Sequence, residues 1–310
     1  MSLNRTLRIG TRGSALAVAQ SGWVRDRLAE AGAPGELVII KTSGDRIQDR
    51  PLQAVGGKGL FVKEIEEALL SEEIDIAVHS LKDMPAELPM GLVLSAIPKR
   101  EDPRDVLIPR DPSVKDLSQL PEGAVVATGS LRRKAQLLRA RPDLQVVGIR
   151  GNIDTRLKKV REGHDGIDAT ILAAAGIQRL GLEVPEAIAL AEKFMLPAVG
   201  QGALAIEARL DAFELEKFLL AIHHTPSATC IAAERAFLER LEGSCTVPLA
   251  GYGIIDGNDV ILRGLVCGEF GEPFYYDEIR GPQAYARRLG GALAERLLDM
   301  GASTVLEALG

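Results

Sequence analysis

A dense group of basic side chains stands out in the middle of the sequence. Between residues 131 and 161, ten Lys and Arg side chains face only two Asp, although the whole chain of 310 residues has a net charge of −6. A charge run of this kind is often a solvated helix face. Guanidinium groups also bind carboxylates and phosphates through two parallel hydrogen bonds. The composition by itself therefore fits either a solvated surface or a site for a polyanion.

The placement of these residues favours the polyanion. Thr128-Gly-Ser130 follows a predicted strand and begins a helix, so its N–H groups and hydroxyls point to where an anion would lie. Arg132 and Arg133 fall in the first turn of that helix, where a cation is unfavourable unless an anion offsets it. Arg150 follows the next predicted strand, and Arg156 lies one turn into the next helix. Two loops of this kind predict a ligand with several carboxylates or phosphates.

Composition excludes several other classes of function. No Phe, Tyr or Trp occurs between residues 131 and 161, so the platform for base stacking is missing and we expect no nucleic-acid partner. No apolar run approaches the roughly 18 residues of a membrane span. Three Cys and four His without ligand spacing predict no metal site and no disulfide framework. The first residues lack the apolar core of an export signal, so we expect a cytoplasmic protein with no membrane partner.

A second group of polar side chains lies in the first hundred residues. Arg12 and Ser14 follow the first predicted strand, and Lys58 lies in a Gly-rich turn that is not a P-loop, because no Ser or Thr follows it. Asp83 follows the apolar strand predicted over 74–78. It fits a turn ahead of a proline. It equally fits a carboxylate that stabilises positive charge or handles a proton in a basic crevice.

Cys245 is the third candidate for chemistry. It follows the helix predicted over 228–241, on a loop that contains Gly and Ser. A single Cys is more often a small buried apolar residue than a nucleophile. Spacing alone leaves its role open.

Short apolar runs alternate with amphipathic stretches over the first two-thirds of the chain. This alternation predicts an α/β protein with parallel sheets and helices on both faces. In such sheets, ligands bind at the carboxyl ends of the strands. The predicted strands are 7–9, 37–41, 74–78, 124–127, 145–149 and 169–172, and a helix is predicted near 60–69. Later strands are expected at 252–255 and 260–266, and a last helix at about 283–299.

Turn-rich stretches suggest where domains meet. Residues 98–103 and 197–202 have the composition of crossings between two α/β units. We expect domain 1 to comprise 1–99 and 199–222, and domain 2 to comprise 100–198. Domain 3, a smaller α/β domain, is expected over 223–310.

Several motifs resemble those of the porphobilinogen deaminase (hydroxymethylbilane synthase) family. They occur in order from near residue 9 to residue 248, and the last 60 residues fit more loosely. Eight motifs in one order make coincidence a poor explanation. The motifs are Ile9-Gly-Thr-Arg-Gly-Ser14, Gly56–Glu64, His79–Pro85, Ser130–Arg133, Arg150–Arg156, Ala174–Leu180, Pro197–Gly202 and Glu234–Cys245.

The resemblance implies a fold and an activity. The implied fold has two doubly wound domains like those of periplasmic binding proteins and a small C-terminal α/β domain. The implied activity is a transferase of tetrapyrrole biosynthesis that joins four porphobilinogen molecules head to tail. It releases ammonia at each step and finally hydroxymethylbilane. The implied cofactor is dipyrromethane, attached by a thioether to Cys245, and we expect the chain to act as a monomer.

The resemblance also assigns roles to single residues. Asp83 matches the family's catalytic aspartate, which faces the pyrrole cation left when ammonia departs. Cys245 matches the cysteine that holds the cofactor. Ser244 stands where the family usually has a second Gly. The positions that match side chains binding cofactor or substrate are Arg12, Ser14, Lys58, Ser80, Lys82, Thr128, Ser130, Arg132, Arg133, Arg150, Arg156, Arg179 and Gln201.

Two other functions use parts of the same pattern. A binding protein with a two-domain cleft would hold an acidic ligand without turnover, and a phosphate-handling transferase would use the same basic loops. Neither function requires both Asp83 and Cys245, so these two residues distinguish the deaminase from both alternatives.

Overall fold

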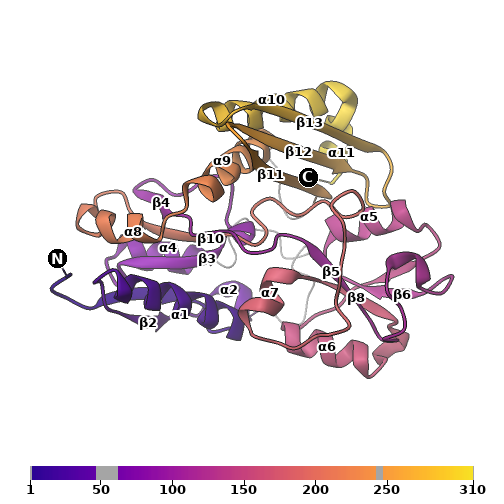
Figure 1. Cartoon of the computed structure of the whole chain (residues 1–310), viewed down its shortest axis with the longest axis horizontal. Coiled ribbons are helices and arrows are strands. Elements are labelled where there is room, and N and C mark those ends of the chain that lie inside the picture. The colour runs from indigo at the N-terminus through magenta and orange to yellow at the C-terminus, as the bar shows by residue number, and fades with distance from the viewer. Residues whose placement is uncertain (1, 47–61, 242–246, 310) are drawn as a thin grey trace. The chain divides into compact units, whose positions relative to one another are not determined.

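The chain forms two compact units. The computed structural model describes residues 2–46, 62–241 and 247–309, and Figure 1 shows their helices and strands. One unit comprises Met1–Glu101 and Ala203–Ile231, and the other comprises Asp102–Gly202 and Ala232–Gly310. The first unit contains one of the described sheets, and the second contains two.

The sheet of the first unit has the strand order β2-β1-β3-β10-β4. Strand β1 is parallel to β2 and β3, whereas β10 is antiparallel to β3 and β4. The strands are β1 (Leu7–Thr11), β2 (Gly35–Ile39), β3 (Ile76–Ser80), β4 (Leu92–Ala96) and β10 (Leu204–Arg209). The helices of this unit include α1 (Ala15–Glu30), α2 (Ser43–Arg46), α4 (Lys63–Leu70) and α8 (Glu216–Ile222).

Local sequence explains where α1 begins and which face it buries. The Ser14 hydroxyl accepts a hydrogen bond from the Ala17 N–H at 3.2 Å, as expected of an N-cap serine. Further along the helix, Val24 and Leu28 are fully buried against the strands of the sheet. The start of α1 is thus fixed directly after β1, which places the Arg12 loop at the carboxyl end of that strand.

The second unit contains a sheet of the same design, with strand order β7-β6-β8-β5-β9. Strand β6 is parallel to β7 and β8, and β5 is antiparallel to β8 and β9. The strands are β5 (Asp105–Pro109), β6 (Val125–Ala127), β7 (Gln145–Val147), β8 (Ala169–Ala173) and β9 (Ile188–Ala189). The helices that follow β6, β7 and β8 are α5 (Leu131–Ala140), α6 (Ile153–Arg161) and α7 (Ala174–Arg179).

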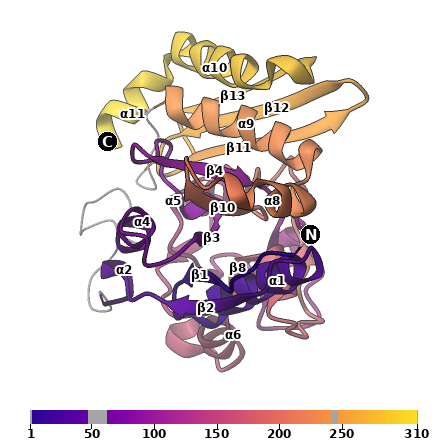
Figure 2. The same ribbon diagram turned by 90° about the vertical axis from the view of Figure 1, so that its left-hand side faces the viewer.

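The third sheet is an antiparallel meander in the order β11-β12-β13, and Figure 2 shows α10 alongside it. Its elements are β11 (Leu249–Asp256), β12 (Asp259–Cys267), β13 (Phe274–Pro282), α9 (Thr225–Arg240), α10 (Ala286–Leu297) and α11 (Ser303–Leu309). Both α9 and α10 lie over one face, because a Cβ on Gly264 would come within 2.7 Å of Phe237 and 2.9 Å of Leu293. Where the two helices cross, a Cβ on Gly290 would lie 2.1 Å from the Ala233 carbonyl oxygen, so only glycine fits.

The predicted fold class is confirmed, with one correction. Most of the predicted strands overlap observed ones, but the sheets are mixed rather than parallel. Parallel neighbours need a crossover connection, usually a helix, between them. Strands β5 and β10 begin within a few residues of the points where the chain passes between units, at Glu101 and Gly202. No crossover of their own unit precedes these strands, and both run antiparallel to their neighbours.

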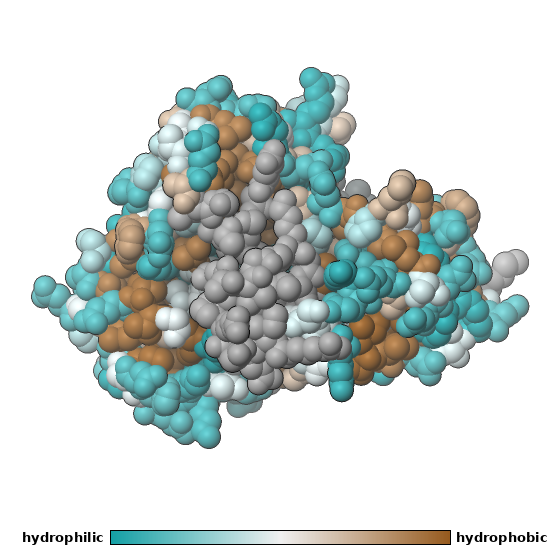
Figure 3. All heavy atoms as spheres, turned by 180° about the vertical axis from the view of Figure 1, so that it is seen from behind, coloured by the Kyte–Doolittle hydropathy of each residue, from teal (hydrophilic) through white to brown (hydrophobic). Residues whose placement is uncertain are grey.

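Hydrophilic side chains and scattered apolar patches share the surface (Figure 3). Among the described residues, Met90 and Phe213 are the most exposed large apolar side chains, at 96% and 76% of their full area. No helix in the described part of the chain is both long enough and apolar enough to cross a membrane.

A buried carboxylate joins the start of β3 to β1. Asp75 accepts hydrogen bonds from the Arg8 backbone N–H at 2.7 Å and from Arg8 Nη2 at 2.9 Å, and Arg5 Nη1 lies 2.8 Å from it. Burial alone would raise the pKa of Asp75, but these bonds outweigh burial and lower the pKa to about 2.

We predict that Asp75→Asn destabilises the protein at neutral pH by about 2 kcal/mol, because the ionised form carries the benefit. The contribution of Asp75 is present above its unfolded pKa of 3.8 and disappears as the pH falls through about 2. Urea unfolding at pH 7 and at pH 3 should therefore show a smaller difference at the lower pH. Asp26→Asn, which breaks an exposed pair with Arg25, is the control and should change little.

Candidate functional site

Four of the loops identified from the sequence follow the carboxyl ends of strands. Arg12 follows β1 and Asp83 follows β3 in the first unit. Thr128 follows β6 and Arg150 follows β7 in the second unit, and Arg179 ends the helix after β8. Since β1 pairs with β3 and β6 pairs with β7 and β8, the loops of each unit lie at one edge of its sheet.

A buried ion-pair network holds the start of α5 in the second unit. Arg132 Nη1 donates to Asp105 Oδ2 at 2.7 Å, and Arg133 Nε donates to Asp105 Oδ1 at 2.9 Å. Gln201 Nε2 also donates to Asp105 Oδ1, at 3.1 Å. Asp105 is fully buried, and the two arginines are 6% and 7% exposed. This carboxylate therefore fixes two of the predicted anion-binding arginines and the predicted Gln201.

Arg132 and Arg133 differ in how many of their guanidinium nitrogens bond to the protein. Arg133 Nη1 donates to the Ile171 carbonyl at 2.9 Å, and its Nη2 lies 2.7 Å from Asp105. Arg132 Nη1 donates to the Leu196 carbonyl at 2.7 Å as well as to Asp105. Arg133 is thus bound within the protein through all three guanidinium nitrogens, whereas Arg132 bonds to the described residues through Nη1.

The network carries more positive than negative charge. Burial alone would raise the pKa of Asp105, but the charges of Arg132 and Arg133 keep it well below its usual range. Burial lowers the pKa of Arg133. The negative charge of Asp105 opposes this lowering, and the like charge of Arg132 adds to it. One carboxylate faces two buried guanidinium groups, so an anionic ligand would be stabilised here.

Arg156 extends this positive region. Its Nε donates to the Gly151 carbonyl at 2.8 Å, which folds the side chain back over its own loop. Burial lowers the pKa of Arg156, and the charges of Arg133 and Arg150 lower it further. Arg150 itself is exposed. Three arginines from two loops are therefore close enough to repel one another, as expected of a site for a polyanion.

The hydroxyls of the loop after β6 also accept hydrogen bonds from backbone N–H groups. Thr128 Oγ1 accepts from the Ser130 N–H at 3.2 Å, and the Ser130 hydroxyl caps α5 by accepting from the Arg133 N–H at 3.4 Å. A hydroxyl that accepts one bond still has its own O–H to donate. Arg179 Nη2 donates to the Gly202 carbonyl at 2.8 Å, at the end of the second unit.

The first unit presents a smaller set of polar groups. The Ser80 hydroxyl lies 3.0 Å from Nε2 and 3.1 Å from Oε1 of Gln20, which is buried. Asp83 closes a short 3₁₀ helix, η1 (Leu81–Asp83), and its side chain is exposed. Lys82 and Arg12 are half-buried. The carboxylate of Asp83 is thus presented to solvent directly after a buried strand.

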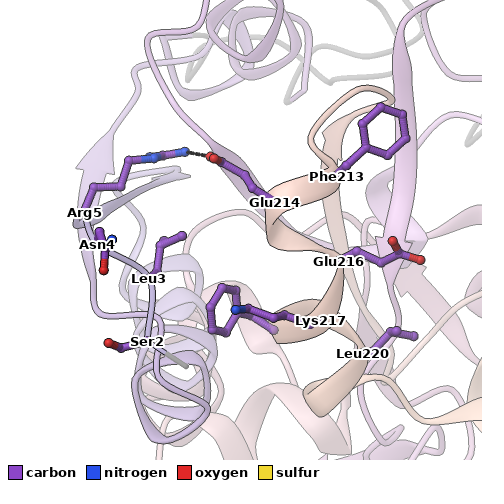
Figure 4. Close-up of a pocket in the computed structure, with 10 residues that line it drawn as sticks. Ser2, Leu3, Asn4, Arg5, Phe213, Glu214, Glu216, Lys217 and Leu220 are labelled. Atoms are coloured by element: carbon purple, nitrogen blue, oxygen red, sulfur yellow. Dashed lines mark hydrogen bonds and ion pairs between the residues drawn. The ribbon is translucent and has the colours of Figure 1, made fainter.

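Some predicted residues and one pocket stand apart from this description. Lys58, Cys245 and its neighbour Ser244 lie outside the described residues. A pocket between the N-terminal segment and α8 is lined by apolar side chains, two cations and two carboxylates (Figure 4). None of the predicted site residues lines this pocket, and its balanced charge does not suit a polyanion. Among the described residues, no cluster of His, Cys, Asp or Glu suits a metal ion.

Asp105 is the residue that sequence reasoning missed. It lies at the start of β5, in a stretch with the acidic and basic residues of a turn-rich crossing. A signal was present, because an aspartate that begins an apolar run is a candidate for a buried carboxylate. Its partners, however, lie 27 and 28 residues away, and only the pairing of β5 with β8 brings them together.

The fold and site define a class of α/β protein with basic loops at the carboxyl ends of its parallel strands. The comparisons with known proteins agree and are more specific. Residues 7–217 match the family model "Porphobilinogen deaminase, dipyromethane cofactor binding domain". Residues 228–299 match the model "Porphobilinogen deaminase, C-terminal domain". The chain therefore belongs to the porphobilinogen deaminase family.

Curated relatives over nearly the full length carry the same name. The porphobilinogen deaminase of Pelobacter propionicus is 50% identical over 305 residues, which cover 98% of this chain and 97% of that protein. The one from Geobacter sulfurreducens is 50% identical over 99% of this chain and 95% of its own. The one from Brevibacillus brevis is 49% identical over 96% of both chains. The family resemblance seen in the motifs is thus confirmed.

We predict that Asp105→Asn destabilises the protein by about 3–5 kcal/mol, because it leaves two buried guanidinium groups without their anion. Asn keeps the size of the side chain, so packing should change little. Asp102→Asn is the matched control, because Asp102 pairs with the half-exposed Arg104 and its loss should cost about 0–1 kcal/mol. Chemical unfolding of the three proteins decides the matter, and similar midpoints would show that the network contributes little.

Proposed function

We propose that the side chains described above carry out the family's reaction in this chain. That reaction joins four porphobilinogen molecules head to tail, releases ammonia at each addition and finally frees hydroxymethylbilane. The observation that supports this role most directly is the charge of the second unit. Arg132 and Arg133 pair with the buried Asp105, and the positive charges of Arg133 and Arg150 act on Arg156. A growing chain of pyrroles with acetate and propionate side chains is the polyanion that such a group would stabilise.

The residues present fit the dipyrromethane cofactor of the family. Its acidic side chains need N–H and O–H donors, and the loops after β6 and β7 offer guanidinium groups, hydroxyls and the N-terminus of α5. When bound, the cofactor supplies the pyrrole carbon to which the first substrate is joined. The side chains proposed to hold cofactor and substrate carboxylates are Arg12, Ser14, Lys58, Ser80, Lys82, Thr128, Ser130, Arg132, Arg133, Arg150, Arg156, Arg179 and Gln201.

Cys245 is proposed to attach the cofactor through a thioether, which a reducing cytoplasm does not cleave. The other two cysteines are poor candidates. Cys230 and Cys267 are buried, at 6% and 1% exposure. Burial also raises the pKa of the Cys267 thiol to about 12, so little thiolate is available at neutral pH.

Asp83 is proposed to stabilise the positive charge that develops when ammonia leaves the substrate. Its carboxylate can accept the pyrrole N–H, and a fixed negative charge lowers the barrier most where charge develops in the transition state. It is also placed to hold a proton during the same step. Arginines bind the substrate equally before and after ammonia leaves, so binding and charge stabilisation are divided between different residues.

We also propose that each sheet belongs to its own domain. Domain 1 would comprise 1–99 and 199–222, domain 2 would comprise 100–198, and domain 3 would comprise 223–310. A cytoplasmic monomer without nucleic-acid partners completes the proposal. The charge pattern bears on the partner, because it suits a small acidic substrate.

We predict that Cys245→Ala gives soluble protein without covalent pyrrole and with almost no product. Intact mass and an aldehyde reagent that colours pyrroles would measure the cofactor, and ammonia release would measure turnover. Cys230→Ala and Cys267→Ala are the controls, and both should keep the cofactor's mass. A cofactor mass retained on Cys245→Ala would contradict the assignment, and a wild-type protein that binds porphobilinogen without releasing ammonia would favour a binding protein.

For Asp83→Asn we predict a fall in turnover on the order of 100- to 1000-fold, because the side chain keeps its size and loses its charge. Asp83→Glu keeps the charge and should retain more activity. The Michaelis constant should change less than the turnover number, since the arginines are untouched. Cofactor content and thermal midpoint are measured for each protein. Near wild-type turnover in Asp83→Asn would make Asp83 a turn residue only.

A further inference from the structure

Buried titratable side chains lie on β3, the strand that precedes the Asp83 loop, and on its neighbour β10. His79 Nε2 and Glu207 Oε2 are hydrogen-bonded at 3.0 Å, and the two side chains are only 4% and 0% exposed. In the antiparallel pair of β3 and β10, Glu207 lies opposite Ala77, two residues from His79 on the same face. The imidazole and the carboxylate are thus held between two central strands.

Helix α4 covers this face and adds a second carboxylate. Ile65 and Leu69 are fully buried against the sheet, and Glu66 beside them is 7% exposed. Oε1 of Glu66 and Oε1 of Glu207 are both buried without a hydrogen-bond partner among the described residues. A buried carboxylate oxygen without a donor is costly, so this site lacks a proton donor.

The surrounding charges do not supply that donor. Burial raises the pKa of Glu66 to about 7, and the negative charges of Glu207 on β10 and Glu67 on α4 contribute to the rise. Arg209, also on β10, donates its Nη1 to the carbonyl oxygens of Leu69 and Ile74. From β3, His79 faces Glu207. The described groups around Glu66 therefore favour its protonated form below about pH 7.

We propose that Glu66 is a positioning residue for the loop that carries Asp83, and that it acts as the neutral acid of a buried unit formed by Glu66, Glu207 and His79. A protonated Glu66 places a neutral side chain on the covered face of the sheet, and it avoids a second buried negative charge near that of Glu207. This inference rests on the proposed function, because it takes Asp83 to serve the reaction.

The backbone connects this unit to Asp83. His79 is followed by Ser80, the last residue of β3, and then by η1, which Asp83 closes. The Leu81 N–H donates to the Ala203 carbonyl at 3.0 Å, and the Leu81 side chain is 1% exposed. Asp83 follows His79 by only four residues, so the position of His79 in β3 constrains where η1 begins.

The first test compares the stability of wild type, Glu66→Gln and Glu67→Gln by urea unfolding between pH 5 and pH 9. The folded protein keeps a proton on Glu66 that the unfolded chain releases above about pH 4.5. Wild type should therefore lose stability as the pH rises from about 4.5 to about 7. Gln mimics the neutral acid and should remove this loss. The folding constant of Glu66→Gln relative to wild type should rise on the order of 100-fold across the range.

Glu67→Gln is the matched control, because Glu67 is exposed on the same helix and pairs with Lys63. Its stability should still fall with rising pH as that of wild type does, and the fall should end at slightly lower pH, because Glu67 makes the smallest of the three contributions to the pKa of Glu66. Parallel curves for wild type and Glu66→Gln would overturn the proposal. If Glu66→Gln does not fold, Glu207→Gln serves instead. Removing the like charge should lower the pKa of Glu66, so the loss of stability should be smaller and should end at lower pH, and an unchanged curve would equally overturn the proposal.

The second test measures turnover against pH with cofactor content checked. The turnover number of Glu66→Gln relative to wild type should rise between pH 6 and pH 9, with little change in the Michaelis constant. A ratio that does not vary with pH would show that Glu66 does not position Asp83. A wild-type protein without any turnover would instead contradict the proposed function, and the stability test would still decide the state of Glu66.

Discussion

The burial of two neighbouring guanidinium groups against one carboxylate is the constraint on which the second unit depends. Asp105 must stay ionised, because without its charge Arg132 and Arg133 would be buried cations with no partner. The pair of arginines still exceeds the carboxylate by one charge, and Arg150 and Arg156 lie nearby. The protein thus tolerates a positive site that is stabilised only in part from within. The proposed acidic ligand would complete it, and the same residues would then both build the fold and attract the substrate.

The two five-stranded sheets repeat one design with different chemistry. Strands β1 and β6 occupy equivalent places, and each is followed by a Gly-Ser step whose serine caps the next helix, at Ser14 and at Ser130. The first unit then presents the exposed carboxylate of Asp83, whereas the second presents arginines. A single arrangement of strand, loop and helix N-terminus therefore presents both the proposed binding side chains for acidic groups and the carboxylate proposed to stabilise a cation.

Three acidic side chains show how environment separates their roles. Asp105 is buried among cations and stays ionised. Asp83 is exposed at the end of a strand, where a carboxylate is available to a substrate. Glu66 is buried beside other carboxylates, and burial raises its pKa to about 7. The residue type is nearly the same in each case, so the surroundings determine whether the group pairs, reacts or holds a proton.

The sequence by itself determined the α/β class, most strands, the family and the basic loops, because these depend on local periodicity and on motifs such as His79–Pro85. It did not reveal that β5 and β10 run antiparallel, since strand direction depends on where the chain re-enters each sheet. It also could not separate Arg133, bound within the protein, from the exposed Arg150. That distinction depends on Asp105, a partner 28 residues away that only strand pairing brings into contact. Tertiary structure decided it, because burial and charge pairing are properties of the folded chain.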